Sequence, residues 1–233
     1  MRQPLNLLKA ALAAALILAL AAPQALAMDK GEADLKVREA KVILDRIMKQ
    51  GDKSIPTDLL VKAKAVGIFP GMFKAGFVVG GQYGTGLFCV RQADGKFGPP
   101  AFFEMGGASV GFQIGAQATD LVLVVMQQKG LDGILKNQVK FGADVAVAAG
   151  PVGRRGEAAV AGASPYADVY SYSLTKGLFA GVSLEGAGIG VDESTNRNYY
   201  GSSHNAREIL LEGQVARPAS ALALIKALNA YAH

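Results

Sequence analysis

Two short patterns in the chain have the residue types and spacing of hydrolytic sites. The first, Gly107-Ala108-Ser109-Val110-Gly111, matches the G-x-S-x-G nucleophile elbow, which needs a sharp strand-to-helix turn and then an acid and a histidine later in the chain. The sequence holds two histidines. One is the terminal His233, and the pattern after Ser109 stays that of a strand. We therefore expect no hydrolase triad built on Ser109 and His204.

The second pattern is that of penicillin-binding enzymes. Ser173-Leu174-Thr175-Lys176 matches S-x-x-K, and Ser194-Thr195-Asn196 matches S-x-N. An S-x-x-K site needs both side chains on one face of a helix. Ser173, however, lies in a strand-like alternation, where residues three apart face opposite sides. No K-T-G or K-S-G element follows Asn196, so we predict that the protein is not an enzyme.

The sequence lacks the residue patterns that usually bind metals and cofactors. Asp192-Glu193 does not have the alternating spacing of a calcium-binding EF-hand loop and indicates a solvated turn. The glycines of residues 81–86 lack the order and the following helix of a dinucleotide site. Cys89, the only cysteine, lies in an apolar run and is expected to be a buried hydrophobic residue. We predict no metal and no cofactor.

Basic residues near the N-terminus are the strongest candidates for a binding surface. On a helical wheel, Arg38 and Lys49 lie opposite an apolar stripe, and Lys36 and Lys41 flank it, as in helices that lie in a membrane interface. Acidic residues share this helix, so a surface helix with salt bridges is an equally good interpretation. The candidate lipid-binding residues here are Lys30, Lys36, Arg38, Lys41, Arg46, Lys49 and Lys53.

The elements that must position these residues are helices at both ends of the chain. The spacing predicts a helix over 29–50, opened by Asp29 and Glu32 as a capping box and closed by Gly51. Short helices are expected after Ile55-Pro56 and at 205–211, and a longer one at 218–231. The apolar stripe of the first helix consists of Ala33, Val37, Ala40, Leu44, Ile47 and Met48.

The middle of the chain predicts short strands punctuated by glycine. The expected strands are 66–69, 76–80, 86–91, 101–105, 120–126, 144–149, 167–174 and 178–189, with a helical turn at 131–137. Frequent glycines favour bent or bulged strands. The fold class is therefore α+β: a strongly curled, barrel-like, mainly antiparallel sheet of short Gly-rich strands, with N-terminal and C-terminal helices packed over it.

The first 27 residues have the pattern of a secretory signal peptide: basic Arg2 and Lys9, an apolar block, and Ala25-Leu26-Ala27 before the expected cleavage point. We predict a single domain over 28–233, exported to the periplasm or secreted, without a transmembrane segment. Removing the two signal-peptide charges lowers the formal net charge from +5 to +3. This mild charge does not favour nucleic acid and permits attraction to anionic lipid.

Residues 176–186 and 195–201 together resemble the signature of the SYLF domain family. Stretches at 55–56, 74–77, 112–115, 119–122 and 150–154 match in the same order. Proteins of that family bind membrane lipids, notably phosphoinositides in eukaryotes, and some associate with actin. The resemblance implies signature residues with a structural or binding role: Lys74, Gly76, Phe77, Lys176, Gly177, Phe179, Gly181, Glu185, Gly186, Asn196 and Tyr200.

Within the signature, Lys176 and Glu185 either pair with each other or contact a ligand. Tyr199 and Tyr200 either anchor at a membrane interface or close the core. Arg154 and Arg155, beside glycine in a loop, are candidates for contact with phosphate.

We therefore predict a non-enzymatic protein of the bacterial cell envelope that binds anionic phospholipid at the membrane surface through its basic N-terminal helix. Two alternatives remain open. One is a carrier that holds an acyl chain or another small apolar ligand inside the sheet, lined by Phe77, Phe88, Phe103 and Phe112. The other is a scaffold that docks a protein partner.

Overall fold

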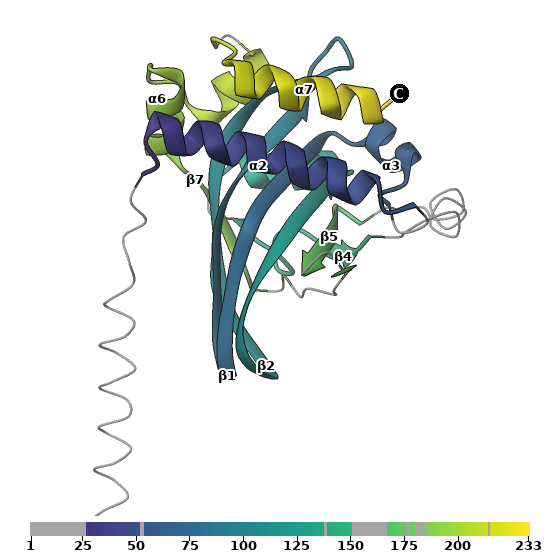
Figure 1. Cartoon of the computed structure of the whole chain (residues 1–233), viewed down its shortest axis with the longest axis vertical. Helices are drawn as coiled ribbons and strands as arrows, with labels where there is room; N and C mark the ends of the chain where they lie inside the picture. The colour runs from purple at the N-terminus through teal and green to yellow at the C-terminus, as the bar shows by residue number, and fades with distance from the viewer. Residues whose placement is uncertain are drawn as a thin grey trace, which may run out of the picture.

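The computed structural model describes residues 27–51, 54–137, 139–150, 167–175, 178–179, 184, 186–213 and 215–233. Figure 1 shows a curved sheet with two roughly parallel rods, α2 (Lys30–Met48) and α7 (Ala219–Tyr231), lying across one face. The short α3 (Thr57–Lys62) lies beyond the end of α2. The predicted α+β class with a strongly curled sheet is confirmed.

One long β-hairpin forms the centre of the sheet. Its strands, β1 (Ala65–Arg91) and β2 (Phe97–Val125), are antiparallel along their whole lengths. Their register shifts near Phe69, Gly76 and Cys89, and such irregularities let a strand bend. The rings of Phe69 and Phe88 are 5.7 Å apart although both belong to β1, so this strand folds back on itself. Five of the predicted short strands are segments of these two long ones, because glycine marks their bends and not their ends.

Shorter strands extend the sheet on both sides of β2. On one side, β5 (Val169–Thr175) pairs with the last part of β2 and, in parallel, with β4 (Val147–Ala149), while β6 (Leu178–Phe179) pairs with β5. On the other side, β7 (Gly188–Val191) pairs with the first half of β2 and with β3 (Val139–Lys140). The sheet is therefore mainly antiparallel, as predicted, with one parallel pair.

Each face of the sheet carries its own hydrophobic cluster. One cluster joins α2, α3 and α7 to strand residues such as Ile68 and Phe102. The other fills the inside of the curl, where α4 (Gln128–Leu135) and the π-helix η2 (Glu208–Glu212) also pack. Phe88 and Phe103, proposed above as lining of a ligand cavity, pack edge to face at 5.1 Å within this second cluster. The side chains of the other two proposed lining residues, Phe77 and Phe112, lie outside the described part of the structure, so the carrier alternative stays a prediction.

The N-terminal helix begins as the sequence predicts. Asp29 accepts a hydrogen bond from the backbone N–H of Glu32, and the Glu32 carboxylate accepts one from Asp29, both at 2.9 Å. The solvated turn expected at Asp192-Glu193 is wrong. Asp192 is buried and caps an additional helix, α6 (Glu193–Tyr200), by accepting a hydrogen bond from the backbone N–H of Thr195. The helix ends at Gly201, whose φ is +68°.

Candidate functional site

The apolar stripe of α2 belongs to the core. Its buried members face α7 and the sheet, so the stripe holds the helix to the body of the protein and does not face outward for insertion into a membrane. The sequence prediction missed one member, Ile43, and included Met48, which is only partly buried. The buried residues are Ala33, Val37, Ala40, Ile43, Leu44 and Ile47.

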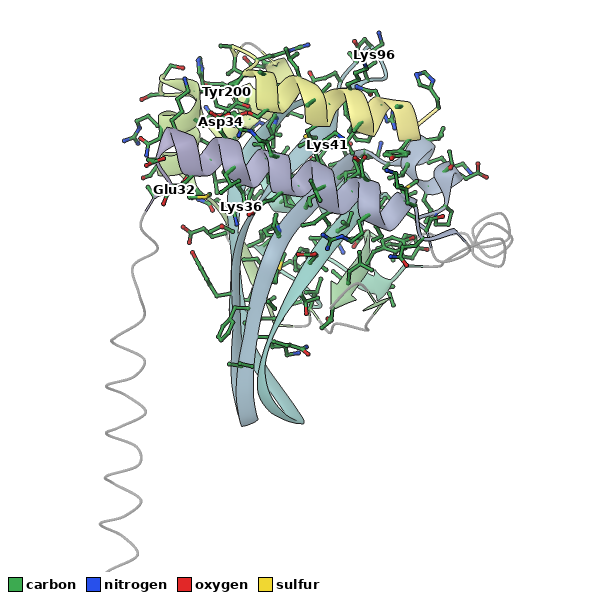
Figure 2. All side chains as sticks on the ribbon, viewed as in Figure 1. Glu32, Asp34, Lys36, Lys41, Lys96 and Tyr200 are labelled. Carbon is green, nitrogen blue, oxygen red and sulfur yellow. The ribbon has the colours of Figure 1, made fainter. Side chains whose placement is uncertain are left out.

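Polar contacts also fasten α2 to α7. The Ser220 hydroxyl donates to the Asp34 carboxylate at 2.5 Å, and the Tyr231 hydroxyl donates to the Asp45 carboxylate at 3.1 Å. Lys41 Nζ lies 2.6 Å from the same carboxylate of Asp45. Figure 2 shows Asp34 and Lys41 on the side of α2 that faces α7. Lys41 is therefore engaged within the protein, and its hydrogen bond to Asp45 raises the pKa of its ammonium group.

The solvent-facing side of α2 combines exposed apolar and basic side chains. Leu35 and Val42 are 53% and 52% exposed, and Arg38, Arg46 and Lys49 are exposed beside them. At 100° per residue, these five positions fall within about 80° of the helix circumference. We call this stripe the outer face of α2. It was not recognised in the sequence, although two large apolar residues seven positions apart and outside the core stripe signal it.

An open groove of about 550 Å³ runs between the outer face and the sheet. Its floor includes Pro70, Gly71 and Asp120. The Asp120 carboxylate accepts a hydrogen bond from Gly71 N at 3.0 Å and forms an ion pair with Arg46 at 3.1 Å. Asp120 thus fixes both the bulge of β1, where Gly71 has a φ of +61°, and the direction of the Arg46 guanidinium.

The exposed apolar surface continues from this groove along the sheet. Phe73 is 52% exposed and pairs with Ala118 of β2. Ala118 and Asp120 are two residues apart in one strand, so they face the same side of the sheet. Phe73 therefore lies on the sheet face that carries the groove, beyond the edge of α2.

The other candidates on the N-terminal helix have different surroundings. Lys30 is exposed at the start of α2. Lys36 lies 3.6 Å from Glu39 and lines the groove, and Figure 2 shows it on the side of α2 away from α7. Arg38, Arg46 and Lys49 thus share the outer face, whereas Lys36 lies about 160° from Arg38 around the helix, next to the core stripe, and Lys41 faces α7.

Several candidates cannot be placed relative to this surface. Outside the described residues lie Lys53, Arg154, Arg155, Lys176, Gly177, Gly181 and Glu185. The backbone is described, without the side chain, at Gly76 and Phe77 of β1 and at Phe179 of β6. Lys74 is partly buried in β1, and Gly186 turns the chain before β7 with a φ of +80°. The phosphate contact expected for the two arginines stays a prediction.

Asn196 of the signature has a structural role. Its side chain is 1% exposed, accepts a hydrogen bond from Phe102 N at 2.8 Å and donates one to Phe102 O at 3.2 Å. The Asn196 side chain therefore links α6 to β2 by bonding to both backbone groups of Phe102, as the backbone of a neighbouring strand would.

The two signature tyrosines close the core. The Tyr199 hydroxyl bonds to Ser220 at 2.9 Å, and Tyr200 donates to Pro100 O at 2.5 Å. Burial raises the pKa of Tyr199 to about 12 and that of Tyr200 still further. Of the two roles left open for these tyrosines, the structure places them in the core and not at an interface.

The motifs with catalytic spacing do not have catalytic geometry. Ser109 lies within β2 and Ser173 within β5, so neither follows a strand-to-helix turn nor shares a helix with its motif partner. Cys89 is completely buried, which raises the pKa of its thiol. The described residues include no group of three or more His, Cys, Asp or Glu that could hold a metal ion. Among the described helices, none has the length and apolar character needed to cross a membrane.

The fold is an α+β module whose helix α2 exposes apolar and basic side chains on its outer face, and the described residues contain no assembled catalytic centre. A family model described as "Ysc84: Las17-binding protein actin regulator" matches residues 106–231. The chain belongs to this family, whose SYLF domain the signature residues predicted.

Relatives in fungi and animals share the domain. LAS seventeen-binding protein 3 of Saccharomyces cerevisiae is 37% identical over 183 residues, which are 78% of this chain and 39% of that protein. SH3 domain-containing YSC84-like protein 1 of Homo sapiens is 37% identical over 181 residues, 77% of this chain and 52% of that protein. An SH3 domain-containing protein of Schizosaccharomyces pombe is 39% identical over 180 residues, 75% of this chain and 41% of that protein. The chain thus spans about two-fifths to half of the length of these relatives.

Proposed function

We propose that the protein is a non-enzymatic binding protein that attaches reversibly to membranes containing anionic phospholipid through the outer face of α2. The observation that carries the proposal is the exposure of Leu35 and Val42 among Arg38, Arg46 and Lys49 on one side of a rigidly held helix. Apolar side chains flanked by cations suit the boundary between acyl chains and charged headgroups. The exposed Phe73 on the adjoining sheet face extends the apolar contact.

The expected affinity is modest. Arg38 and Lys49 contribute about 1 kcal/mol each near an anionic surface, and Arg46 is left out because it is paired with Asp120. Leu35 and Val42, which already have about half of their surface covered, contribute about 1 kcal/mol each when the rest is buried. The sum of about 4 kcal/mol corresponds to a dissociation constant of about 1 mM for lipid. Such binding is peripheral, and it weakens as salt screens the charges.

The cellular setting of this proposal follows from the N-terminal sequence. A signal peptide over residues 1–27 would deliver the protein to the periplasm or the exterior. The lipids there would be envelope phospholipids such as phosphatidylglycerol and cardiolipin. Their phosphates take the place of the phosphoinositide headgroups that the family resemblance implies for eukaryotic members.

Sedimentation with liposomes tests the proposal. The exported protein should sediment with vesicles containing phosphatidylglycerol and not with neutral vesicles, and the bound fraction should fall between low and physiological salt. The double variant Arg38→Glu with Lys49→Glu should abolish sedimentation. Lys96→Glu with Lys226→Glu is the matched control: it changes the charge equally at exposed positions in the β1–β2 turn and on α7. Equal loss in both variants, or binding to neutral vesicles, would contradict the proposal.

A second candidate function is the docking of a protein partner. It is supported by the description of the family as Las17-binding and by the name of the yeast relative. The same groove offers both an apolar surface and the paired charges of Arg46 and Asp120. Failure to sediment with any vesicle, together with co-sedimentation with filamentous actin that Leu35→Ser and Val42→Ser abolish, would favour this function over lipid binding.

A further inference from the structure

Both backbone groups of Met28, just before α2, are hydrogen-bonded to α6. Its backbone N–H donates to Thr195 Oγ1 at 2.9 Å, and its carbonyl oxygen accepts from Asn198 Nδ2 at 2.9 Å. Its side chain packs against the cluster beneath α2 and α7. The preceding Ala27 is exposed. Figure 1 shows the start of α2 next to α6, which supplies both partners.

We infer that the Ala27–Met28 peptide bond is a processing site and that the new N-terminal ammonium group of Met28 binds in a preformed seat on α6. Hydrolysis by a signal-peptide endopeptidase adds water across this amide, leaving a carboxylate on Ala27 and an ammonium group on Met28. Two independent observations meet at this bond. In the sequence, the small residues Ala25 and Ala27 follow the apolar block, and in the structure Met28 is held by both of its backbone groups while Ala27 is exposed.

The seat suits a charged amine as well as the uncut amide. Thr195 is fully buried, so its hydroxyl oxygen is held in place as an acceptor. The first turn of a helix ordinarily disfavours a cation. Here the buried carboxylate of Asp192 caps that turn, and Glu193 follows it, so their negative charges offset this effect. The hydrogen bond of an ammonium donor is stronger than that of a neutral amide, so cleavage strengthens the contact that positions the start of α2.

This inference does not depend on membrane binding. The seat lies where α6 meets the first residue of the mature chain, whereas the outer face of α2 begins at Leu35. The docked N-terminus would fix the position of α2 on the fold whatever its outer face binds.

The first test uses the full 233-residue chain, expressed in a bacterium that exports it. Intact mass and N-terminal sequencing should show a protein that begins at Met28. Retention of residues 1–27, or a different first residue, would overturn the inference.

The second test measures how accessible the new amine is. Acylation of the Met28 amine by an N-hydroxysuccinimide ester, followed by peptide mapping, should be about tenfold faster in Thr195→Val than in the unchanged protein, because the amine must leave its acceptor before it reacts. Thr119→Val is the matched control: it removes another buried hydroxyl, which bonds to Thr175 at 2.9 Å far from Met28. It should leave the rate unchanged.

A variant at an exposed residue guards against misfolding. If circular dichroism shows that Thr195→Val does not fold, Asn198→Ala takes its place, because Asn198 is exposed and contacts the carbonyl of Met28. It should accelerate acylation of Met28 several-fold. Rates equal to that of the unchanged protein in a folded seat variant would refute the seat.

Discussion

Two asparagine side chains, Asn196 and Asn229, each form hydrogen bonds with both the N–H and the carbonyl of one strand residue. Replacing each of them measures how much such a pair of hydrogen bonds contributes to the free energy of unfolding. Asn196 on α6 bonds to both backbone groups of Phe102. Asn229 on α7 does the same for Phe97, accepting from its N–H at 2.8 Å and donating to its carbonyl at 3.3 Å. The two sites differ in burial, since Asn196 is 1% exposed and Asn229 is partly exposed.

Replacement of Asn196 by alanine should be the more costly change. It leaves the buried N–H of Phe102 without a partner, and such a group costs about 1 to 3 kcal/mol. The Phe102 carbonyl keeps the hydrogen bond that it accepts from Asp192 N at 3.0 Å. We expect a loss of about 2 to 3 kcal/mol in the free energy of unfolding, which lowers the melting temperature by about 7 °C in a domain of this size. At Asn229, water can reach the freed groups, so Asn229→Ala should cost only about 1 kcal/mol.

Urea denaturation and thermal unfolding followed by circular dichroism measure both changes. Asn196→Asp, which keeps the shape and the acceptor but loses the donor and gains a charge, should be at least as destabilising as the alanine variant at pH 7. Equal losses for Asn196→Ala and Asn229→Ala would refute the reasoning, because burial would then not decide the cost.

Two further predictions concern the sheet and the helix pair. Gly86→Ala should lower the melting temperature by more than 5 °C, because the added Cβ would lie 2.4 Å from the Phe69 ring and 2.5 Å from a backbone oxygen. Gly81→Ala is the control. Its Cβ would lie 3.9 Å from the nearest atom, so the melting temperature should change little. Burial opposes ionisation of the Asp45 carboxyl, but the hydrogen bonds that it accepts from Lys41 and Tyr231 hold its pKa below the usual 3.8. The ionised carboxylate therefore stabilises the fold above pH 3.8. This contribution is lost as the pH falls through the lowered pKa. Asp45→Asn should therefore melt about 2 °C lower at pH 7 and match the unchanged protein in strong acid; an equal difference at both pH values would contradict the ionic contribution.

The sequence predicts the helices of this fold better than its strands. The capping box at Asp29 and Glu32 is a local signal, and local hydrogen bonds decide where a helix begins. The end is predicted less closely, since α2 stops at Met48, with Lys49 as its C-cap, before the expected Gly51. The strands depend on pairing with residues far along the chain. The sequence therefore predicts separate strands that end at the glycines which bend β1 and β2, since a turn and a bulge need the same backbone freedom.

The missed helix α6 has a similar cause. Asp192 and Glu193 suggest a solvated loop by composition, and Tyr199 and Tyr200 are weak helix formers. The helix forms because Asp192 caps it and Asn196 and Tyr199 bury themselves against β2 and Ser220. These are tertiary contacts, and no periodicity within eight residues reveals them. The outer face of α2 is different, because helical periodicity alone places Leu35 and Val42 outside the core stripe; what the sequence does not show is that none of the described elements covers them.

The structure also distinguishes two ways in which α2 could meet a membrane. If its core stripe were to insert, Val37, Ile43, Leu44 and Ile47 would first have to leave the core, where each is at most 4% exposed. At about 2 kcal/mol per side chain, this costs about 8 kcal/mol, comparable with the whole stability of a typical domain. Binding through the outer face needs no such detachment. Hydrogen exchange on vesicles should therefore leave the backbone amides of residues 33–47 as protected as in solution, and loss of their protection upon binding would show that the helix leaves the core.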